Sequence, residues 1–232
     1  MLTIVLLPGM DGTGDLFAPF VEALGGEFNV QVVRYPTMGS LGYEELETIA
    51  RSSLPSKGSF VVLGESFSGP IAVSIAASQP PGLVGLIMCS TFVRNPRPTF
   101  RALSSLVNLL PVTLMPITVL NYLLLGRYST TTLRSALASA ISQVSASALQ
   151  ARVKAVLSND VSVKFKTLKI PVLYLLAKYD RVVPPNAVEH MVRTLPITQV
   201  VPVAAPHFLL QAAPGAAANF VGAFMRKVQA SL

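Results

Sequence analysis

Short apolar runs alternate with helix-like stretches along most of this 232-residue chain, and this alternation constrains its fold more than any other feature. The apolar runs predict six strands, at residues 2–7, 30–35, 60–63, 83–88, 172–177 and 199–203. Several of them are apolar at consecutive positions, which is typical of strands buried on both faces. The stretches between them predict helices at residues 15–24, 43–54, 69–77, 186–195 and 215–228. We therefore predict an α/β fold with a mostly parallel six-stranded sheet and helices on both of its faces.

The alternation stops once, between the fourth and fifth predicted strands. Residues 93–157 contain only helix-forming runs that Pro and Gly residues interrupt. Within them, residues 102–126 carry no charge and are numerous enough to span a bilayer, but Pro111 and Pro116 break the run, so we expect no transmembrane segment. We therefore predict two parts: a core formed by residues 1–92 and 158–232, and a helical lid formed by residues 93–157.

The composition excludes several classes of protein. Hydrophobic residues make up 51% of the chain and charged residues only 12%, which excludes a disordered chain or a coiled coil, because neither buries so much apolar surface. A single cysteine excludes a disulfide framework, and with only two histidines we expect neither a metal site nor another cofactor. The first residues lack the basic region and the long apolar run of a secretory signal peptide, so we expect a cytoplasmic protein.

The net charge of +7 comes from the middle of the chain. No Asp or Glu lies between Ser66 and Asn159, whereas seven Arg and Lys residues do. These basic residues are not interleaved with aromatic residues, as they are in proteins that bind single-stranded nucleic acid, so we expect no nucleic-acid partner.

Ser66 lies in the sequence Gly-Glu-Ser-Phe-Ser-Gly, directly after the third predicted strand. A serine becomes a nucleophile when its Oγ is exposed beside a base and beside N–H groups that stabilise an oxyanion. A sharp turn from strand to helix presents a serine in this way and needs small residues two positions to either side, which Gly64 and Ser68 supply. The amide of Phe67, at the start of the next helix, would be one oxyanion donor.

Two further polar residues follow predicted strands. Asp180 comes after the fifth strand and His207 after the sixth. Because the carboxyl ends of parallel strands meet at one edge of a sheet, we expect both side chains to lie near Ser66. We therefore predict a catalytic triad in which His207 takes the proton of Ser66 and Asp180 orients the imidazole.

With these residues, the chain resembles the α/β-hydrolase fold serine hydrolases over nearly its whole length. The resemblance rests on the nucleophile turn, the acid loop, the histidine loop and the loop after the first strand, at residues 64–68, 180–184, 207–211 and 7–12. It implies that the amides of Met10 and Phe67 form the oxyanion hole. Pro8 stands where this family often has His, and Ser68 where it often has Gly.

The glycine-rich loop after the first strand also invites comparison with nucleotide-binding motifs. Its outer glycines are spaced as in a P-loop, but Asp15 and Leu16 stand where that motif requires Lys and Ser or Thr. Phe17 replaces the last glycine of a dinucleotide-binding motif, and two acidic residues would repel phosphate. We therefore do not expect a nucleotide ligand.

The predicted function is that of a carboxylesterase, a serine hydrolase that forms an acyl-enzyme on Ser66 with small to medium aliphatic acyl esters. We expect a monomer or a weak homodimer. An apolar acyl group needs an apolar wall, which the uncharged part of the predicted lid offers. The candidate substrate-binding residues are Leu106, Leu110, Leu114, Met115 and Leu120.

Other functions remain open on the same residues. The same triad also supports thioester hydrolysis, acyl transfer, carbon–carbon hydrolysis and perhydrolysis. The resemblance includes esterases that release a methyl ester from an acyl chain on an acidic carrier protein. We therefore hypothesise that an acidic carrier protein or an anionic membrane surface docks on Arg94, Arg97, Arg101, Arg127 and Arg134. A ligand receptor that keeps the fold and turns over slowly is a further alternative.

Overall fold

The computed structural model describes residues 1–99 and 116–232 and is built around one six-stranded sheet. All neighbouring strands are parallel, in the order β2-β1-β3-β4-β5-β6. The strands are β1 (Thr3–Leu7), β2 (Asn29–Val32), β3 (Phe60–Glu65), β4 (Leu83–Cys89), β5 (Val172–Ala177) and β6 (Gln199–Val203). The predicted parallel sheet of six strands is therefore confirmed.

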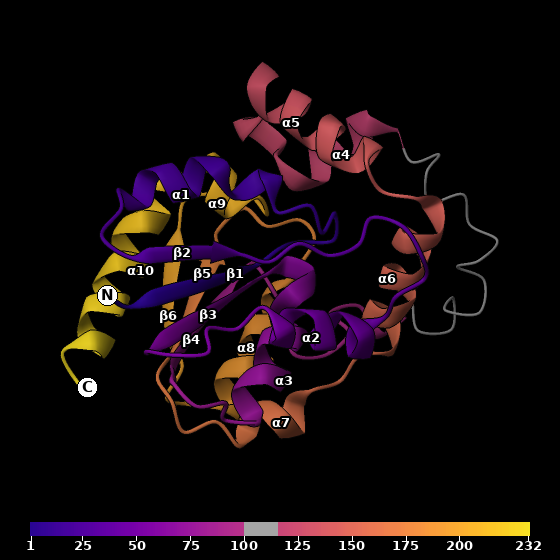
Figure 1. Ribbon diagram of the computed structural model, residues 1–232. Coiled ribbons are helices and arrows are strands. Elements are labelled where there is room, and N and C mark those ends of the chain that lie inside the picture. Colours follow the sequence, from indigo (N-terminus) through magenta and orange to yellow (C-terminus); the bar gives the residue numbers. More distant parts are fainter. Residues whose placement is uncertain (100–115) are drawn as a thin grey trace.

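Helices cover both faces of this sheet (Figure 1). One face packs against α1 (Ala18–Leu24), α9 (Leu209–Ala212) and α10 (Pro214–Gln229). The other face packs against α2 (Tyr43–Ser52), α3 (Gly69–Ala77), α7 (Ser162–Lys166) and α8 (Pro185–Thr194). Alternate residues of one strand enter the two cores, as Leu6 and Leu7 do, and this explains why the strands are apolar at consecutive positions.

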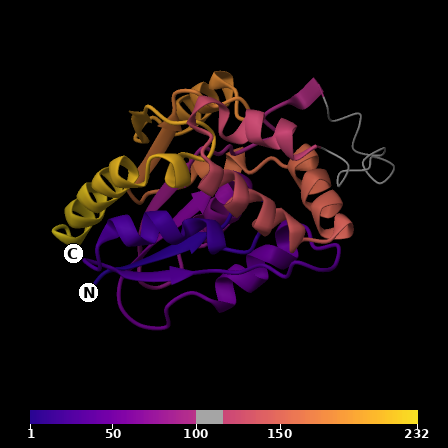
Figure 2. The same cartoon turned by 90° about the horizontal axis from the view of Figure 1, so that it is seen from above.

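Helices also connect β4 to β5. After the segment outside the described residues come α4 (Ile117–Leu124), the 3-10 helix η6 (Gly126–Tyr128), α5 (Thr131–Ser142) and α6 (Ala146–Ser158). The side chains of Thr130 and Ser145 cap α5 and α6 by accepting hydrogen bonds from backbone amides in their first turns. The two termini lie close together, and α6 lies on the opposite side of the molecule (Figures 1 and 2). The predicted bounds of the lid, 93–157, remain a prediction.

No helix within residues 1–99 and 116–232 is both long enough and apolar enough to cross a bilayer. Most of the uncharged run that raised this question lies outside the described residues. Its described end forms α4, which has only eight residues.

Two strands, β2 and β3, differ in length from the predicted runs by two residues each, whereas β1 and β4 differ by one residue. β2 ends at Val32 because the chain then turns, and Tyr35 donates its amide hydrogen bond to Gly12 in the loop after β1. β3 continues to Glu65 because Gly64 and Glu65 still pair with Met88 and Cys89 of β4. The extra residues of β3 carry the chain directly into the turn at Ser66.

Candidate active site

Ser66 occupies a sharp turn between β3 and the short 3-10 helix η2 (Ser66–Ser68), which leads into α3. Its φ is 48°, in a left-handed region that residues with a Cβ seldom adopt and that costs about 1–2 kcal/mol. The strand and the helix approach so closely that a Cβ on Gly64 would lie 2.7 Å from the Ala72 Cβ. Position 64 therefore requires glycine, and the turn has the geometry expected of a nucleophile elbow.

Contacts from neighbouring elements hold this strained turn in place. The hydroxyl of Thr91, just after β4, donates a hydrogen bond to the Ser66 carbonyl. The hydroxyl of Tyr43, at the start of α2, donates to the Phe67 carbonyl over 3.0 Å, and the two rings stack with their centroids 4.7 Å apart. These contacts offset the strain at Ser66. Thr91 and Tyr43 are not marked by any sequence pattern, because each acts through a tertiary contact.

Ser68 links the nucleophile turn to the loop after β1. Its hydroxyl donates a hydrogen bond to the Pro8 carbonyl and lies 2.9 Å from the Tyr35 hydroxyl. Because a hydroxyl carries one proton, Tyr35 must be the donor in the second bond. Both positions at which this chain departs from the resembled family, Pro8 and Ser68, therefore form one contact between the two loops.

Ser66, His207 and Asp180 form one hydrogen-bonded chain. The Ser66 Oγ lies 2.7 Å from His207 Nε2, and His207 Nδ1 lies 2.9 and 3.0 Å from the two carboxylate oxygens of Asp180. A carboxylate only accepts hydrogen bonds, so Nδ1 carries the proton and Nε2 accepts from the Ser66 hydroxyl. The structure thus brings together the three predicted triad residues, in the arrangement that lets a histidine take a proton from a serine.

The loops that carry Asp180 and His207 are also held by hydrogen bonds. Asp180 Oδ1 accepts from the backbone amides of Val182 and Val183, at 2.8 and 2.9 Å. Beside His207, the amide of Phe208 donates to the carbonyl of Leu124 at the end of α4, over 3.0 Å. The side chains of His207 and Asp180 are only 3% and 6% exposed, so the imidazole and the carboxylate are shielded from water.

The two predicted oxyanion donors come from the residue after Ser66 and from the loop after β1. Phe67 is the second residue of η2, where a helix amide has no acceptor within its own helix. Met10 lines the same cavity as Ser66, and no residue of the described chain accepts a hydrogen bond from its amide. Both amides are therefore available to a ligand, as an oxyanion hole requires.

A cavity of about 300 Å³ opens beside Ser66 and His207. Larger surface hollows of the described chain contain neither of these residues. Most of the cavity wall is apolar and comes from α4, α5, α6 and the loops at the sheet edge. The apolar residues are Met10, Leu16, Leu120, Leu123, Leu124, Leu137, Ile141, Leu149, Val153, Val182 and Phe208.

Leu120 is the one predicted substrate-binding residue that the structure describes, and it lines this cavity. The other four, Leu106, Leu110, Leu114 and Met115, lie outside the described residues. The prediction of substrate-binding residues did not include the cavity residues of α5 and α6, because it considered only the uncharged run at residues 102–126. A helical period in those two segments was the available signal, since Leu137 and Ile141 are four residues apart, as are Leu149 and Val153.

Glu65, directly before Ser66, is a buried carboxyl group that also lines the cavity. Its Oε1 accepts a hydrogen bond of 2.9 Å from Gln211 Nε2. Burial raises the pKa of Glu65 from its ordinary value of 4.5 to about 7, and the nearby charge of Asp11 adds to this effect. The Gln211 hydrogen bond and the charge of His207 act in the opposite direction. Glu65 therefore takes up or releases a proton near neutral pH.

Replacing Glu65 by Gln should make the folded protein more stable above pH 7 and should flatten the dependence of its stability on pH. Between pH 4.5 and about 7, folded Glu65 keeps a proton that the unfolded chain releases, so the free energy of unfolding of the wild type falls as the pH rises. The rise in the Glu65 pKa from 4.5 to about 7 corresponds to a loss of about 3 kcal/mol in the free energy of unfolding across this pH range. Urea unfolding at pH 5 and pH 8 measures the difference.

The matched control for this measurement is Glu44→Gln, because Glu44 is exposed at the start of α2. That variant should keep the pH dependence of the wild type. An E65Q variant that loses stability between pH 5 and pH 8 as steeply as the wild type would show that Glu65 is already ionised in the folded protein.

The described part of the site offers neither a metal-binding cluster nor a reactive thiol. The described residues contain no group of three or more His, Cys, Asp or Glu side chains that could hold a metal ion. The lone cysteine, Cys89, is buried at the end of β4, and burial raises the pKa of its thiol well above the ordinary value. Cys89 is thus a packing residue rather than a second nucleophile.

Comparisons with known proteins give the same fold. Residues 44–209 match the family described as serine aminopeptidase, S33. A carboxylesterase of Nitrososphaera gargenis superposes with a TM-score of 0.83 at 14% identity, over 100% of this chain and 92% of that chain. A thermophilic esterase of Thermogutta terrifontis has a TM-score of 0.79 at 21% identity, over 98% and 90% of the two chains. At these identities the superpositions establish the fold.

One curated relative is similar in sequence. Phytyl ester synthase 1 (chloroplastic) of Arabidopsis thaliana is 33% identical over an alignment of 104 residues that covers 40% of this chain. The chain spans only 15% of the length of that relative.

Proposed function

Because this chain belongs to the serine aminopeptidase S33 family, within the α/β-hydrolase superfamily, we propose that it is a carboxylic ester hydrolase acting through an acyl-enzyme on Ser66. Its substrates are esters of small to medium aliphatic acids, and water is the second acceptor. The single observation that carries the proposal is the hydrogen-bonded chain of Ser66, His207 and Asp180 at the wall of an apolar cavity.

The proposed reaction has two half-reactions, and in each of them His207 first takes a proton and then gives it up. His207 Nε2 takes the proton of Ser66 as Oγ attacks the ester carbonyl, and the carbonyl oxygen becomes an oxyanion. The amides of Met10 and Phe67 stabilise that oxyanion. His207 then gives its proton to the departing alcohol, which leaves the acyl group on Ser66. A water molecule then gives a proton to His207 and attacks the acyl carbonyl, and His207 returns that proton to Ser66 Oγ as the carboxylic acid leaves.

The apolar wall supports an aliphatic acyl group rather than a charged one. Three helices contribute leucine side chains to the cavity: Leu120, Leu124, Leu137 and Leu149. A hydrocarbon chain bound against them is removed from water, and no polar group loses a hydrogen-bond partner. A charged acyl group would lose its hydration against these leucine side chains and gain no partner from them.

Replacing Leu120 by Trp should shorten the acyl chain that the enzyme accepts. The indole would fill part of a cavity of about 300 Å³, so kcat/KM should fall by about tenfold or more for an octanoyl ester and change little for an acetyl ester. Val119→Trp is the matched control, because Val119 is the neighbouring residue of α4, is 41% exposed and does not line the cavity. Equal losses for the octanoyl and acetyl esters would contradict this assignment of the acyl site.

A second candidate function is transfer of the acyl group to an alcohol instead of water. The similarity to phytyl ester synthase 1 favours it, and the apolar cavity is compatible with a hydrophobic acceptor. Adding a long-chain alcohol to the same assay discriminates the two, because transfer yields a new ester and hydrolysis yields only the free acid.

Docking of an acidic carrier protein remains a hypothesis about the natural substrate. Five arginines were predicted to form the docking surface. Four of them are exposed, namely Arg94, Arg97, Arg127 and Arg134, and Arg101 lies outside the described residues. The ring of Tyr179, in the loop that carries Asp180, lies under Arg127, with the guanidinium carbon 4.0 Å from the ring centroid. Arg127 is therefore close to the loop that holds the acid of the candidate site.

A further inference from the structure

Arg152, in α6, is a basic residue that the structure removes from the surface. Its exposed fraction is 0%, and it is the only Lys or Arg among the buried residues of the described chain. Burial lowers the pKa of its guanidinium, and the nearby charge of Asp11 acts in the opposite direction. A buried cation is strongly unfavourable unless it is hydrogen-bonded, so the partners of Arg152 indicate why it is there.

Those partners are backbone carbonyls of two loops at the sheet edge. Arg152 Nη1 donates to the carbonyls of Met10 and Asp11, at 2.7 and 2.9 Å, and Nη2 donates to the carbonyl of Pro36 at 2.7 Å. Met10 and Asp11 belong to the loop after β1, and Pro36 follows β2. One guanidinium from α6 thus binds both loops through charge-assisted hydrogen bonds.

The backbone of the loop after β1 is shaped to receive this guanidinium. Gly12 has a φ of 73°, and a Cβ at this position would lie 2.8 Å from Arg152 Nη1. Any other residue there would push the guanidinium away from the Met10 and Asp11 carbonyls. Gly12 is therefore required both by its backbone conformation and by the close approach of Arg152.

The hydrogen bonds of Arg152 are made to the two peptide groups that follow the Met10 amide, which is one of the proposed oxyanion donors. A trans peptide is planar, so its N–H and C=O point in opposite directions. The peptide that carries the Met10 amide is oriented by the Gly9 carbonyl, which accepts from the Gly12 amide over 3.1 Å. The next two peptides are oriented by the carbonyls that Arg152 binds. The direction of the Met10 amide is therefore set by one backbone turn and by Arg152.

We propose that Arg152 is a positioning residue that holds the loop after β1 so that the Met10 amide points at the oxyanion. The inference rests on the proposed function, because it concerns the same serine chemistry. Arg152 touches neither Ser66 nor the reacting atoms in this role. The helical segment between β4 and β5 thereby contributes to the oxyanion hole as well as to the cavity wall.

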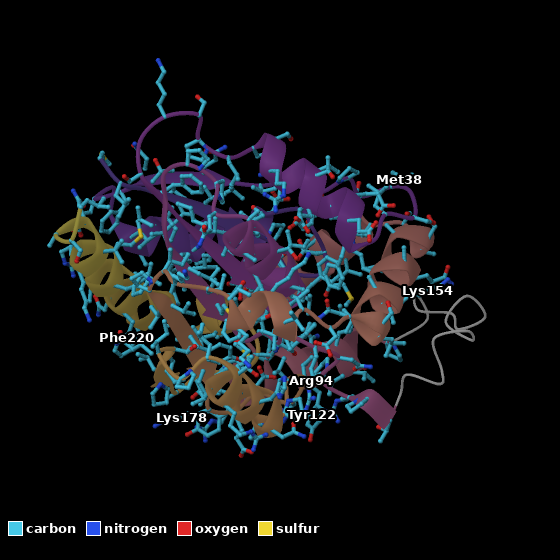
Figure 3. The ribbon with its side chains drawn as sticks, turned by 90° about the horizontal axis from the view of Figure 1, so that it is seen from below. Met38, Arg94, Tyr122, Lys154, Lys178 and Phe220 are labelled. Atoms are coloured by element: carbon cyan, nitrogen blue, oxygen red, sulfur yellow. The ribbon has the colours of Figure 1, made fainter. Side chains whose placement is uncertain are left out.

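The test compares Arg152→Ala and Arg152→Lys with Lys154→Met. Lys154 is the matched control because it is an exposed basic residue of the same helix and lies on its outer side (Figure 3). For Arg152→Ala we expect kcat on an activated ester to fall by about 10–100-fold, with KM changed by less than about threefold, since a displaced oxyanion donor acts mainly on the transition state. Lys154→Met should keep the wild-type kcat.

Two further measurements distinguish positioning from a general structural role. The rate constant for phosphonylation of Ser66 by a fluorophosphonate should fall with kcat, because that reaction also develops charge on an oxygen in the oxyanion hole. Millimolar guanidinium should restore part of the activity of Arg152→Ala by occupying the vacated space. All rates are expressed per reactive Ser66, counted by the extent of labelling, so that unfolded protein does not contribute.

Each outcome decides the inference. A folded Arg152→Ala variant with wild-type kcat and phosphonylation rate overturns it, as does a loss explained fully by fewer reactive sites. Where the alanine variant does not fold, Arg152→Lys replaces it, since lysine keeps the charge but not the two-armed geometry. A lysine variant with wild-type rates then overturns the inference. Wild-type protein that labels on Ser66 but hydrolyses no ester would refute the proposed function instead, and the phosphonylation rates would still test Arg152.

Discussion

Replacing Ser66 by Ala is expected to lower kcat on an activated ester by about four to six orders of magnitude and to abolish labelling by a fluorophosphonate. Without the Oγ there is no atom 2.7 Å from His207 Nε2 to lose its proton and attack the carbonyl. The cavity and the oxyanion amides stay in place, so a small residual rate above that of water should remain. The mass shift of the intact protein measures the labelling, and mapping the labelled peptide identifies the residue that carries the label.

Ser68→Ala is the matched control for this variant. Ser68 is also a serine of η2, but its hydroxyl is bonded to the Pro8 carbonyl and to Tyr35 and is fully buried. A Ser68→Ala variant should therefore still be labelled, and on Ser66. A label on any other residue of the wild type, or a labelled Ser66→Ala variant, would show that the nucleophile is elsewhere.

Replacing Asp180 by Asn is expected to lower kcat by about 10⁴-fold with little change in the fold. The asparagine amide group would replace Oδ2, the nearer acceptor of His207 Nδ1 at 2.9 Å, with a donor, and this favours the tautomer that carries its proton on Nε2. Nε2 would then be unable to accept the proton of Ser66. The Asn Oδ1 still accepts from the amides of Val182 and Val183, which keeps the loop in place. Steady-state kinetics and phosphonylation rates both measure the loss.

Asp160→Asn is the control for Asp180→Asn. Asp160 is exposed, and its Oδ1 accepts a hydrogen bond from the amide of Ser162, away from His207. That variant should keep the wild-type kcat. An Asp180→Asn variant that stays within about tenfold of the wild type would mean that another group orients His207.

Local sequence was sufficient to predict the sheet, because each strand carries its own signal. β5 and β6 have the predicted bounds, since they are short apolar runs that turn-forming residues end on both sides. The end of β2 was less predictable. Val33 and Tyr35 continue the apolar pattern of that run, but Tyr35 leaves the sheet to bond with Gly12 and Ser68. The apolar pattern shows which residues could form a strand, whereas the contacts of Tyr35 with Gly12 and Ser68 set the point at which β2 ends.

The three triad positions were predictable for a similar reason. A parallel sheet brings the carboxyl ends of its strands to one edge, so Ser66, Asp180 and His207 could be expected to converge although 141 residues separate the first from the last. Convergence at an edge does not specify distances. The hydrogen-bond lengths and the tautomer of His207 follow from loop contacts such as those of Asp180 with the amides after it.

The amino-acid sequence alone was enough to predict the alternation of strands and helices, and with it the parallel sheet and the edge at which the candidate site lies. It could do so because these features depend on the period of apolar residues along the chain. It took the three-dimensional contacts to reveal that Glu65 is buried with a pKa of about 7, that α5 and α6 line the cavity and that Arg152 binds the loop after β1. These properties depend on which distant groups surround a residue, and a buried arginine is indistinguishable from a solvated one until its neighbours are known.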